Sequence, residues 1–157
     1  MATLHMMCGM VGAGKTTRAC EIEAETHAVR LSPDDWITRL MSNRDNRAEA
    51  NRMRDQIEAI QWEVAQKLLA SGADVILENG FWGKGEREER RDVARALGAK
   101  VCLHFLNPLE EELWRRLVQR NRVIEVGAFR VTREELNEWI DWFQKPDADE
   151  IASYDAY

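Results

Sequence analysis

The chain has 157 residues and a net charge of −6, with 45% hydrophobic and 32% charged residues. This length fits one globular domain with a single core, and the composition excludes a disordered or collagen-like chain. The acidic balance makes nucleic acid or an anionic membrane a poor default partner, although it does not exclude a local basic cleft.

The first half of the chain alternates short apolar runs with longer helical patterns. An apolar strand is predicted at 4–8, followed by a glycine-rich loop and a helix at 16–25. A second strand at 27–31 leads into Ser32-Pro33, which favours a helix start, with the helix continuing over 34–41. Polar residues at 42–47 precede a long helix at 47–70, indicated by its apolar spacing. The third strand, at 75–77, ends in Glu78-Asn79-Gly80.

The second half continues the alternation. A loop is predicted at 83–85, a charged helix at 86–97 and a fourth strand at 100–106. Asn107-Pro108 is expected to cap a helix that ends near residue 121, and 122–130 is irregular. A capping box at 132–135 predicts a C-terminal helix over about 132–143. The acidic tail from Pro146 is expected to be frayed.

This order of elements predicts the α/β class. Alternating strands and helices favour a three-layer fold, with a parallel sheet of four to five strands and helices on both faces. No linker or repeat divides the chain, so we expect a single domain over 1–157. Ligands of such sheets bind beyond the carboxyl ends of the strands, where the motifs below fall.

Residues 9–16 match the phosphate-loop pattern GxxxxGK[ST] in full. Such a loop brings backbone N–H groups and a helix N-terminus to a phosphate chain, which predicts the P-loop NTPase fold and binding of a nucleoside triphosphate, without distinguishing ATP from GTP. Its lysine bridges phosphates and its threonine can bind Mg²⁺. The expected contacts are Gly9, Gly12, Ala13, Gly14, Lys15 and Thr16. Thr17 is either a further phosphate contact or an ordinary residue of the first helical turn.

Carboxylates follow two of the strands. Asp34 and Asp35 come after the second strand, where one could serve as a general base or could only complement the helix dipole. Glu78 ends the third strand, like the acidic residue of a Walker B motif, and is a candidate to support the metal. Asn79 is either an acceptor contact or a turn residue.

Arginines and tryptophans supply the remaining candidates. Arg116 and Arg120 are four residues apart on one helix face and could neutralise a phosphoryl transition state, or could pair with the glutamates one turn earlier. The basic stretch of Arg39, Arg44, Arg47, Arg52 and Arg54 is either an anion-binding surface or a solvated helix face. Further candidates for the acceptor site are Asp35, Trp36, Arg39, Trp82 and Arg87.

Taken together, these motifs resemble the AAA_33-like small P-loop kinases, which include polynucleotide 5′-kinase, chloramphenicol phosphotransferase and zeta-toxin kinases. The resemblance runs over about residues 4–121. It implies that Asp34 is the general base and that Arg116 and Arg120 belong to a lid at about 115–130 that closes over ATP. The sequence departs from the pattern at Ile37, where the polynucleotide kinases have an arginine, and at Glu78, where Asp is usual.

The resulting prediction is a phosphotransferase that moves the γ-phosphoryl group of MgATP to a hydroxyl of a small molecule such as an antibiotic, nucleoside or sugar. A polynucleotide or RNA 5′-hydroxyl kinase is the first alternative, and a P-loop NTPase switch or binding module without an acceptor is the second. Three cysteines without CxxC spacing, and the lack of a signal peptide or membrane-length apolar run, predict a cytoplasmic protein with no membrane association. The sequence leaves the oligomeric state open.

Overall fold

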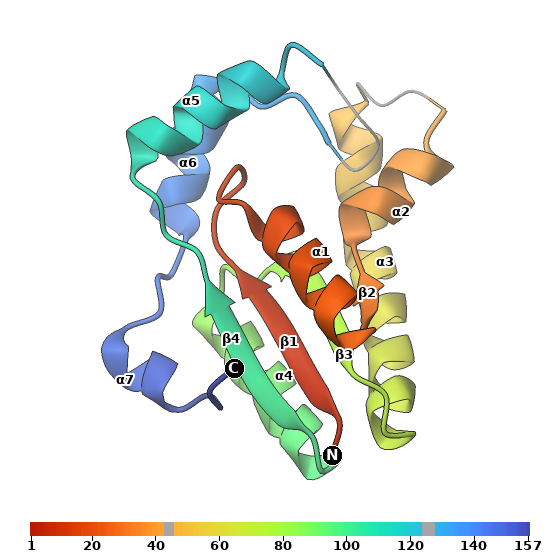
Figure 1. The fold of residues 1–157 in the computed structure, drawn as a ribbon. Helices are drawn as coiled ribbons and strands as arrows, with labels where there is room; N and C mark the ends of the chain where they lie inside the picture. The colour runs from red at the N-terminus through yellow and green to blue at the C-terminus, as the bar shows by residue number, and fades with distance from the viewer. Residues whose placement is uncertain (43–45, 124–127) are drawn as a thin grey trace.

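The computed structural model describes residues 1–42, 46–123 and 128–157. Figure 1 shows a sheet with helices in front of it and behind it. The strands are β1 (Thr3–Cys8), β2 (Val29–Leu31), β3 (Val75–Gly80) and β4 (Lys100–Phe105). The helices are α1 (Lys15–Thr26), α2 (Pro33–Leu40), α3 (Arg47–Ala70), α4 (Lys84–Ala96), α5 (Glu110–Arg120), α6 (Arg133–Trp142) and α7 (Ala148–Ala152).

The sheet is parallel and has the strand order β2-β3-β1-β4. This arrangement confirms the predicted α/β class and the parallel sheet. Because β1 lies in the interior of the sheet, between β3 and β4, the loop that follows it emerges at the middle of the carboxyl edge. The segment after β3 emerges at the same edge, so the phosphate loop and Glu78 become neighbours.

Side-chain alternation along β1 divides the core between the two faces of the sheet. Leu4, Met6 and Cys8 belong to the larger buried cluster, which includes Trp62 and Ala65 of α3. Met7 points to the opposite face and packs with residues of α1. α1 therefore covers the front face in Figure 1, while α3 and α4 cover the back. None of the helices in the described ranges is both long and apolar enough to cross a membrane.

Local capping signals explain the helix starts that the sequence predicted. The Ser32 hydroxyl accepts a hydrogen bond from the Asp35 N–H at the start of α2. Asn46 caps α3 in the same way through the Glu49 N–H. Thr132 and Glu135 form the predicted capping box at the start of α6. Each side chain satisfies an N–H that the first helical turn leaves unpaired.

Three predicted boundaries are wrong. β2 begins only at Val29, because His27 ends α1 in the left-handed region at φ 60°. α4 begins at Lys84, so most of the predicted 83–85 loop is helical. Asn107-Pro108 does not cap α5, whose N-cap residue is Leu109 and which begins at Glu110.

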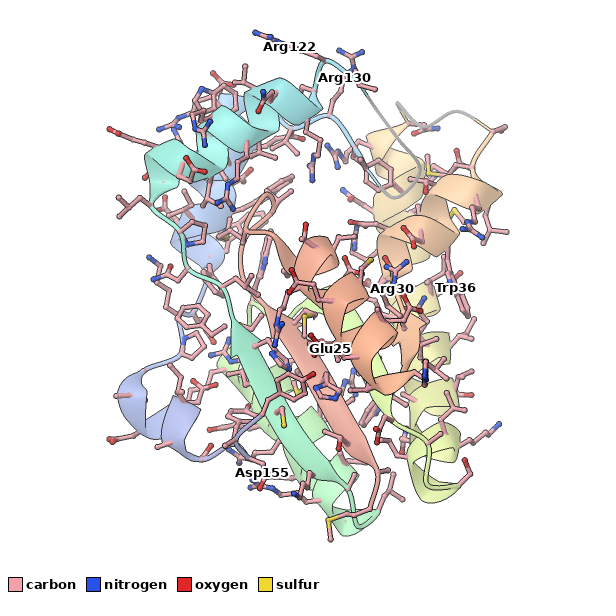
Figure 2. The ribbon with its side chains drawn as sticks, viewed as in Figure 1. Glu25, Arg30, Trp36, Arg122, Arg130 and Asp155 are labelled. Atoms are coloured by element: carbon pink, nitrogen blue, oxygen red, sulfur yellow. The ribbon has the colours of Figure 1, made fainter. Side chains whose placement is uncertain are left out.

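The tail beyond Pro146 is ordered, contrary to the prediction that it is frayed. Asp147 caps α7 by accepting a hydrogen bond from the Glu150 N–H. Past α7, the Asp155 N–H donates to the Val101 carbonyl and the Val101 N–H donates to the Asp155 carboxylate, both at 2.8 Å. The chain thus returns to β4, where Figure 2 labels Asp155. Contacts with distant residues, rather than local signals, order this segment.

Candidate active site

The loop between β1 and α1 has two positions, Gly9 and Gly12, where the backbone conformation and the close neighbours favour glycine. A Cβ on Gly9 would lie 2.5 Å from the Leu106 carbonyl oxygen, and Gly9 has φ 151°. Gly12, at φ 79°, faces Leu117 of α5, and an added Cβ would lie 3.2 Å from that side chain. These approaches explain the glycine spacing, because the loop must curl tightly while α5 packs directly on it.

Lys15 is held inside the loop by backbone carbonyls. Its Nζ donates to the Gly9 and Met10 carbonyl oxygens at 3.0 and 2.8 Å. Burial lowers the pKa of Lys15 to about 8, and the negative charges of Asp34 and Glu78 only partly oppose this effect. A multiply charged anion beside this ammonium group would stabilise its charged form and compensate for the solvation that burial removes.

Thr16 and Glu78 meet at the carboxyl edge of the sheet. The Thr16 hydroxyl donates to one carboxylate oxygen of Glu78, and Arg30 Nη1 donates to the other at 2.7 Å. A hydroxyl and a carboxylate are oxygen donors of the kind that Mg²⁺ prefers, so the pair fits a magnesium ion beside the phosphates. Arg30 also pairs with Asp35 at 2.9 Å, which directs the Asp35 carboxylate toward Arg30.

Asp34 lies at the start of α2 and faces α3. Its Oδ1 accepts a hydrogen bond from Arg54 Nη2 at 2.5 Å, and its side chain is still 42% exposed. Arg54 also approaches Glu58 at 3.6 Å. Burial raises the pKa of Glu58 to about 7, although Arg54 partly opposes the shift. Arg54 is therefore the residue that fixes the orientation of the Asp34 carboxylate.

α5 places two arginines above the phosphate loop. Arg116 Nη1 lies 3.4 and 3.3 Å from the Gly12 and Ala13 carbonyl oxygens, and its Nε donates to Glu112 at 2.6 Å. Arg120 Nη2 lies 3.4 Å from the Phe129 carbonyl oxygen, while its buried Nε lacks a hydrogen-bond partner among the described residues. Burial lowers the pKa of Arg120. Both side chains are thus near the place where phosphates would lie.

One cavity of about 1490 Å³ connects these groups. The phosphate loop forms its floor, α5 one wall, and α3 another, through Arg47, Asn51, Arg54 and Asp55. Aromatic side chains complete it: Trp82, Phe129, Trp139 and Trp142. Small-molecule pockets usually have volumes of about 300–1,000 Å³. The cavity therefore has room for a nucleotide and a second molecule.

The cavity includes most of the predicted nucleotide contacts. Gly12, Ala13, Gly14, Lys15, Thr16, Thr17, Arg116 and Arg120 line it, together with Asp34, Glu78, Asn79 and Trp82. Gly9 lies beneath the loop and binds the Lys15 and Trp82 side chains through its carbonyl. The predicted lid, at about 115–130, comprises the end of α5 and the segment after it, of which 124–127 are outside the described residues. Arg122 and Arg130 lie at the outer end of α5 in Figure 2.

Four predicted acceptor residues do not line the cavity. Arg87 is fully buried, with its guanidinium on Glu150 and on the Phe81 carbonyl, so it cannot contact an acceptor. Trp36 packs against the apolar clusters beside α2 and α3. Arg39 is exposed on α2 and Asp35 is paired with Arg30. Arg44 is outside the described residues.

Sequence reasoning missed the roles of Arg47 and Arg54, because it treated their stretch as a single basic surface. Arg47 lies over the rings of Phe129 and Trp139, at 5.3 and 5.8 Å from their centres, and donates to the Arg130 carbonyl. It thereby joins α3 to α6. Arg47 and Arg54 are seven residues apart, which puts both on one helix face. This spacing is the sequence signal that could have indicated a shared role.

The sequence matches the model of the AAA domain family AAA_33 over residues 4–146. The chain therefore belongs to this family. A search of the curated proteins finds no significant match.

Three solved structures have a similar fold. Kti12 from Chaetomium thermophilum, in complex with ADP-AlF3, has a TM-score of 0.69 and 17% identity, covering 92% of this chain and 81% of that one. A chain of the Pnkp1/Rnl/Hen1 RNA repair complex has a TM-score of 0.62 and 19% identity, and the match covers 91% of this chain and 44% of that one. A gluconokinase from Sinorhizobium meliloti 1021 has a TM-score of 0.60 and 16% identity, and the match covers 94% of this chain and 77% of that one. Family and fold define a nucleotide-dependent kinase or NTPase of the P-loop class.

Proposed function

We propose that the protein is a phosphotransferase that moves the γ-phosphoryl group of MgATP to a hydroxyl group of a small-molecule acceptor. The observation that carries this proposal is that Asp34 and the phosphate loop line the same cavity. A hydrolytic switch needs room for water, whereas about 1490 Å³ leaves room for a whole acceptor beside the nucleotide.

Each group has a distinct task in the proposed reaction. Lys15 and the loop N–H groups bind the β- and γ-phosphates, while Arg116 and Arg120 neutralise charge on the transferred group. The acceptor oxygen forms a bond to the γ-phosphorus as the bond to the β,γ-bridging oxygen breaks, and ADP leaves with that electron pair. The acceptor proton passes to the Asp34 carboxylate, which Arg54 orients.

Thr16 and Glu78 would hold Mg²⁺, which would neutralise part of the phosphate charge. On the acceptor side, Trp82, Trp139 and Trp142 offer flat apolar surfaces beside the polar groups of α3. This mixture suits a polar molecule with apolar faces, such as a sugar or an antibiotic. The similarity to a gluconokinase fold supports this acceptor class without identifying the molecule.

A phosphoryl-transfer screen tests the proposal. The protein, γ-labelled ATP and Mg²⁺ are incubated with aminoglycosides, other hydroxyl-bearing antibiotics, nucleosides, sugars and a 5′-hydroxyl oligonucleotide, with Lys15→Ala as the inactive control. Label on one small molecule supports the proposal and names the acceptor class. Label on the oligonucleotide would instead favour the polynucleotide kinase alternative, and inorganic phosphate alone would favour an NTPase.

A further inference from the structure

The end of β3 and the residues after it are hydrogen-bonded to Gly9, the first glycine of the phosphate loop. The Gly9 N–H donates to the Gly80 carbonyl at 3.0 Å. In the reverse direction, Trp82 Nε1 donates to the Gly9 carbonyl at 3.2 Å. The same carbonyl also accepts a hydrogen bond from Lys15 Nζ at 3.0 Å. Gly9 thus has two donors on one oxygen, one from the loop lysine and one from the indole.

Of the two donors on the Gly9 carbonyl, only Lys15 would have to move when a nucleotide binds. To reach the β- and γ-phosphates, Lys15 Nζ must leave the Gly9 and Met10 carbonyls that it now binds. A carbonyl that loses its only donor in a buried site is costly. Because Trp82 also binds the Gly9 oxygen, that oxygen stays paired after Lys15 has moved.

Trp82 is held in place from two other directions. The preceding residue, Phe81, has φ 50°, an unfavourable conformation for a side chain of this size, so surrounding contacts must fix it. Its carbonyl accepts a hydrogen bond from Arg87 Nη1 at 2.8 Å. Arg87 is bound by both carboxylate oxygens of Glu150 at 2.6 and 3.0 Å. The Trp82 carbonyl accepts from the Gln144 N–H at 3.0 Å.

The buried pair of Arg87 and Glu150 therefore has a place in the site even though neither residue lines the cavity. α4 supplies the arginine, α7 the glutamate, and both act on the backbone that carries Trp82. The indole ring itself lines the cavity and lies 5.8 Å from the Trp139 ring of α6. The N–H is consequently aimed at the phosphate loop by a rigid frame.

We propose that Trp82 is a positioning residue that keeps the Gly9 carbonyl paired while Lys15 moves from the loop carbonyls to the nucleotide phosphates. This inference rests on the nucleotide-binding part of the proposed function and does not depend on the acceptor. It assigns Trp82 to the phosphate loop rather than to acceptor recognition alone.

The test is a double-mutant cycle on MgATP binding, measured by isothermal titration calorimetry. Trp82→Phe keeps a ring and removes the N–H, so we expect an affinity loss of roughly five- to thirtyfold, as for a buried carbonyl left unpaired. In a Lys15→Ala background no lysine leaves the carbonyl, and the same substitution should change the affinity less than about twofold. Trp114→Phe, on α5 outside the cavity, is the matched control and should bind as the wild type does.

Two results would overturn the inference: wild-type affinity in Trp82→Phe, or an equal loss with and without Lys15. Urea unfolding of each variant separates a folding defect from a binding defect. If Trp82→Phe does not fold, 3-benzothienylalanine at position 82 replaces only the N–H by sulfur and repeats the test. Wild-type protein that fails to bind MgATP would refute the proposed function together with the inference, whereas binding without transfer would refute only the function.

Discussion

Raising the pH from 7 to 9 should weaken MgATP binding by about tenfold through Lys15. Burial lowers the pKa of this lysine to about 8 in the free protein. Its protonated fraction therefore falls from about nine-tenths at pH 7 to about one-tenth at pH 9. The phosphates bind the ammonium form, so binding at pH 9 must first restore the proton. Over the same range the phosphate charge of ATP is nearly constant, since its last pKa is about 6.

Titration calorimetry in buffers of different ionisation enthalpy measures both consequences. Proton uptake should rise from about half a proton for each ATP bound at pH 8 to close to one at pH 9, and the apparent affinity should fall with pH. Lys15→Arg is the matched control, because a guanidinium stays charged throughout this range. An affinity that is flat between pH 7 and 9 in the wild type, with no proton uptake, would refute the reasoning.

Two further predictions concern the carboxyl groups of Glu150, which is buried, and Glu58, which is partly buried. Glu150→Gln leaves the Arg87 guanidinium buried without a counter-charge and should lower the free energy of unfolding by about 3 kcal/mol in urea denaturation. The exposed control Asp149→Asn should leave the free energy of unfolding unchanged. Equal urea midpoints for Glu150→Gln and the wild type would contradict the stabilising role of the Arg87–Glu150 pair. The raised pKa of Glu58, about 7, means that the folded state binds a proton more tightly than the unfolded state. The contribution of Glu58 to stability therefore falls as pH rises from about 4.5 to 7. Glu58→Gln should be more stable than the wild type by roughly 1–3 kcal/mol at pH 8, and this difference in the free energy of unfolding should vanish near pH 4. A difference that does not depend on pH would count against this reasoning.

The phosphate loop and the order of the elements could be predicted from sequence because their signals are local. Residues 9–16 are contiguous, and the strand before them and the helix after them leave clear hydrophobic patterns. The long helix over 47–70 was predicted with its observed bounds from its apolar spacing, and the structure shows Asn46 and Ser71 as its capping residues. The parallel sheet followed from the alternation of strands and helices.

The contacts that were missed join residues far apart in the chain. Arg87 and Glu150 are separated by 63 positions, and no local pattern pairs an arginine of a charged helix with a glutamate of an acidic tail. Arg54 reaches Asp34 only because packing fixes the rotation of α3 beside α2, which hydrophobic periodicity specifies too coarsely to orient a single arginine. Local reasoning thus located the phosphate site and left open which side chains surround the acceptor.

The central claim is that Asp34 takes the proton of an acceptor hydroxyl beside the bound nucleotide. The most direct test compares Asp34→Asn with the wild type in single-turnover transfer from γ-labelled ATP to the acceptor found by the screen, together with MgATP affinity. We predict near-normal MgATP affinity and transfer slower by about 10²- to 10⁴-fold, while Asp35→Asn, whose carboxylate faces Arg30, keeps most of its activity. An Asp34→Asn protein that transfers phosphate at the wild-type rate would contradict the account.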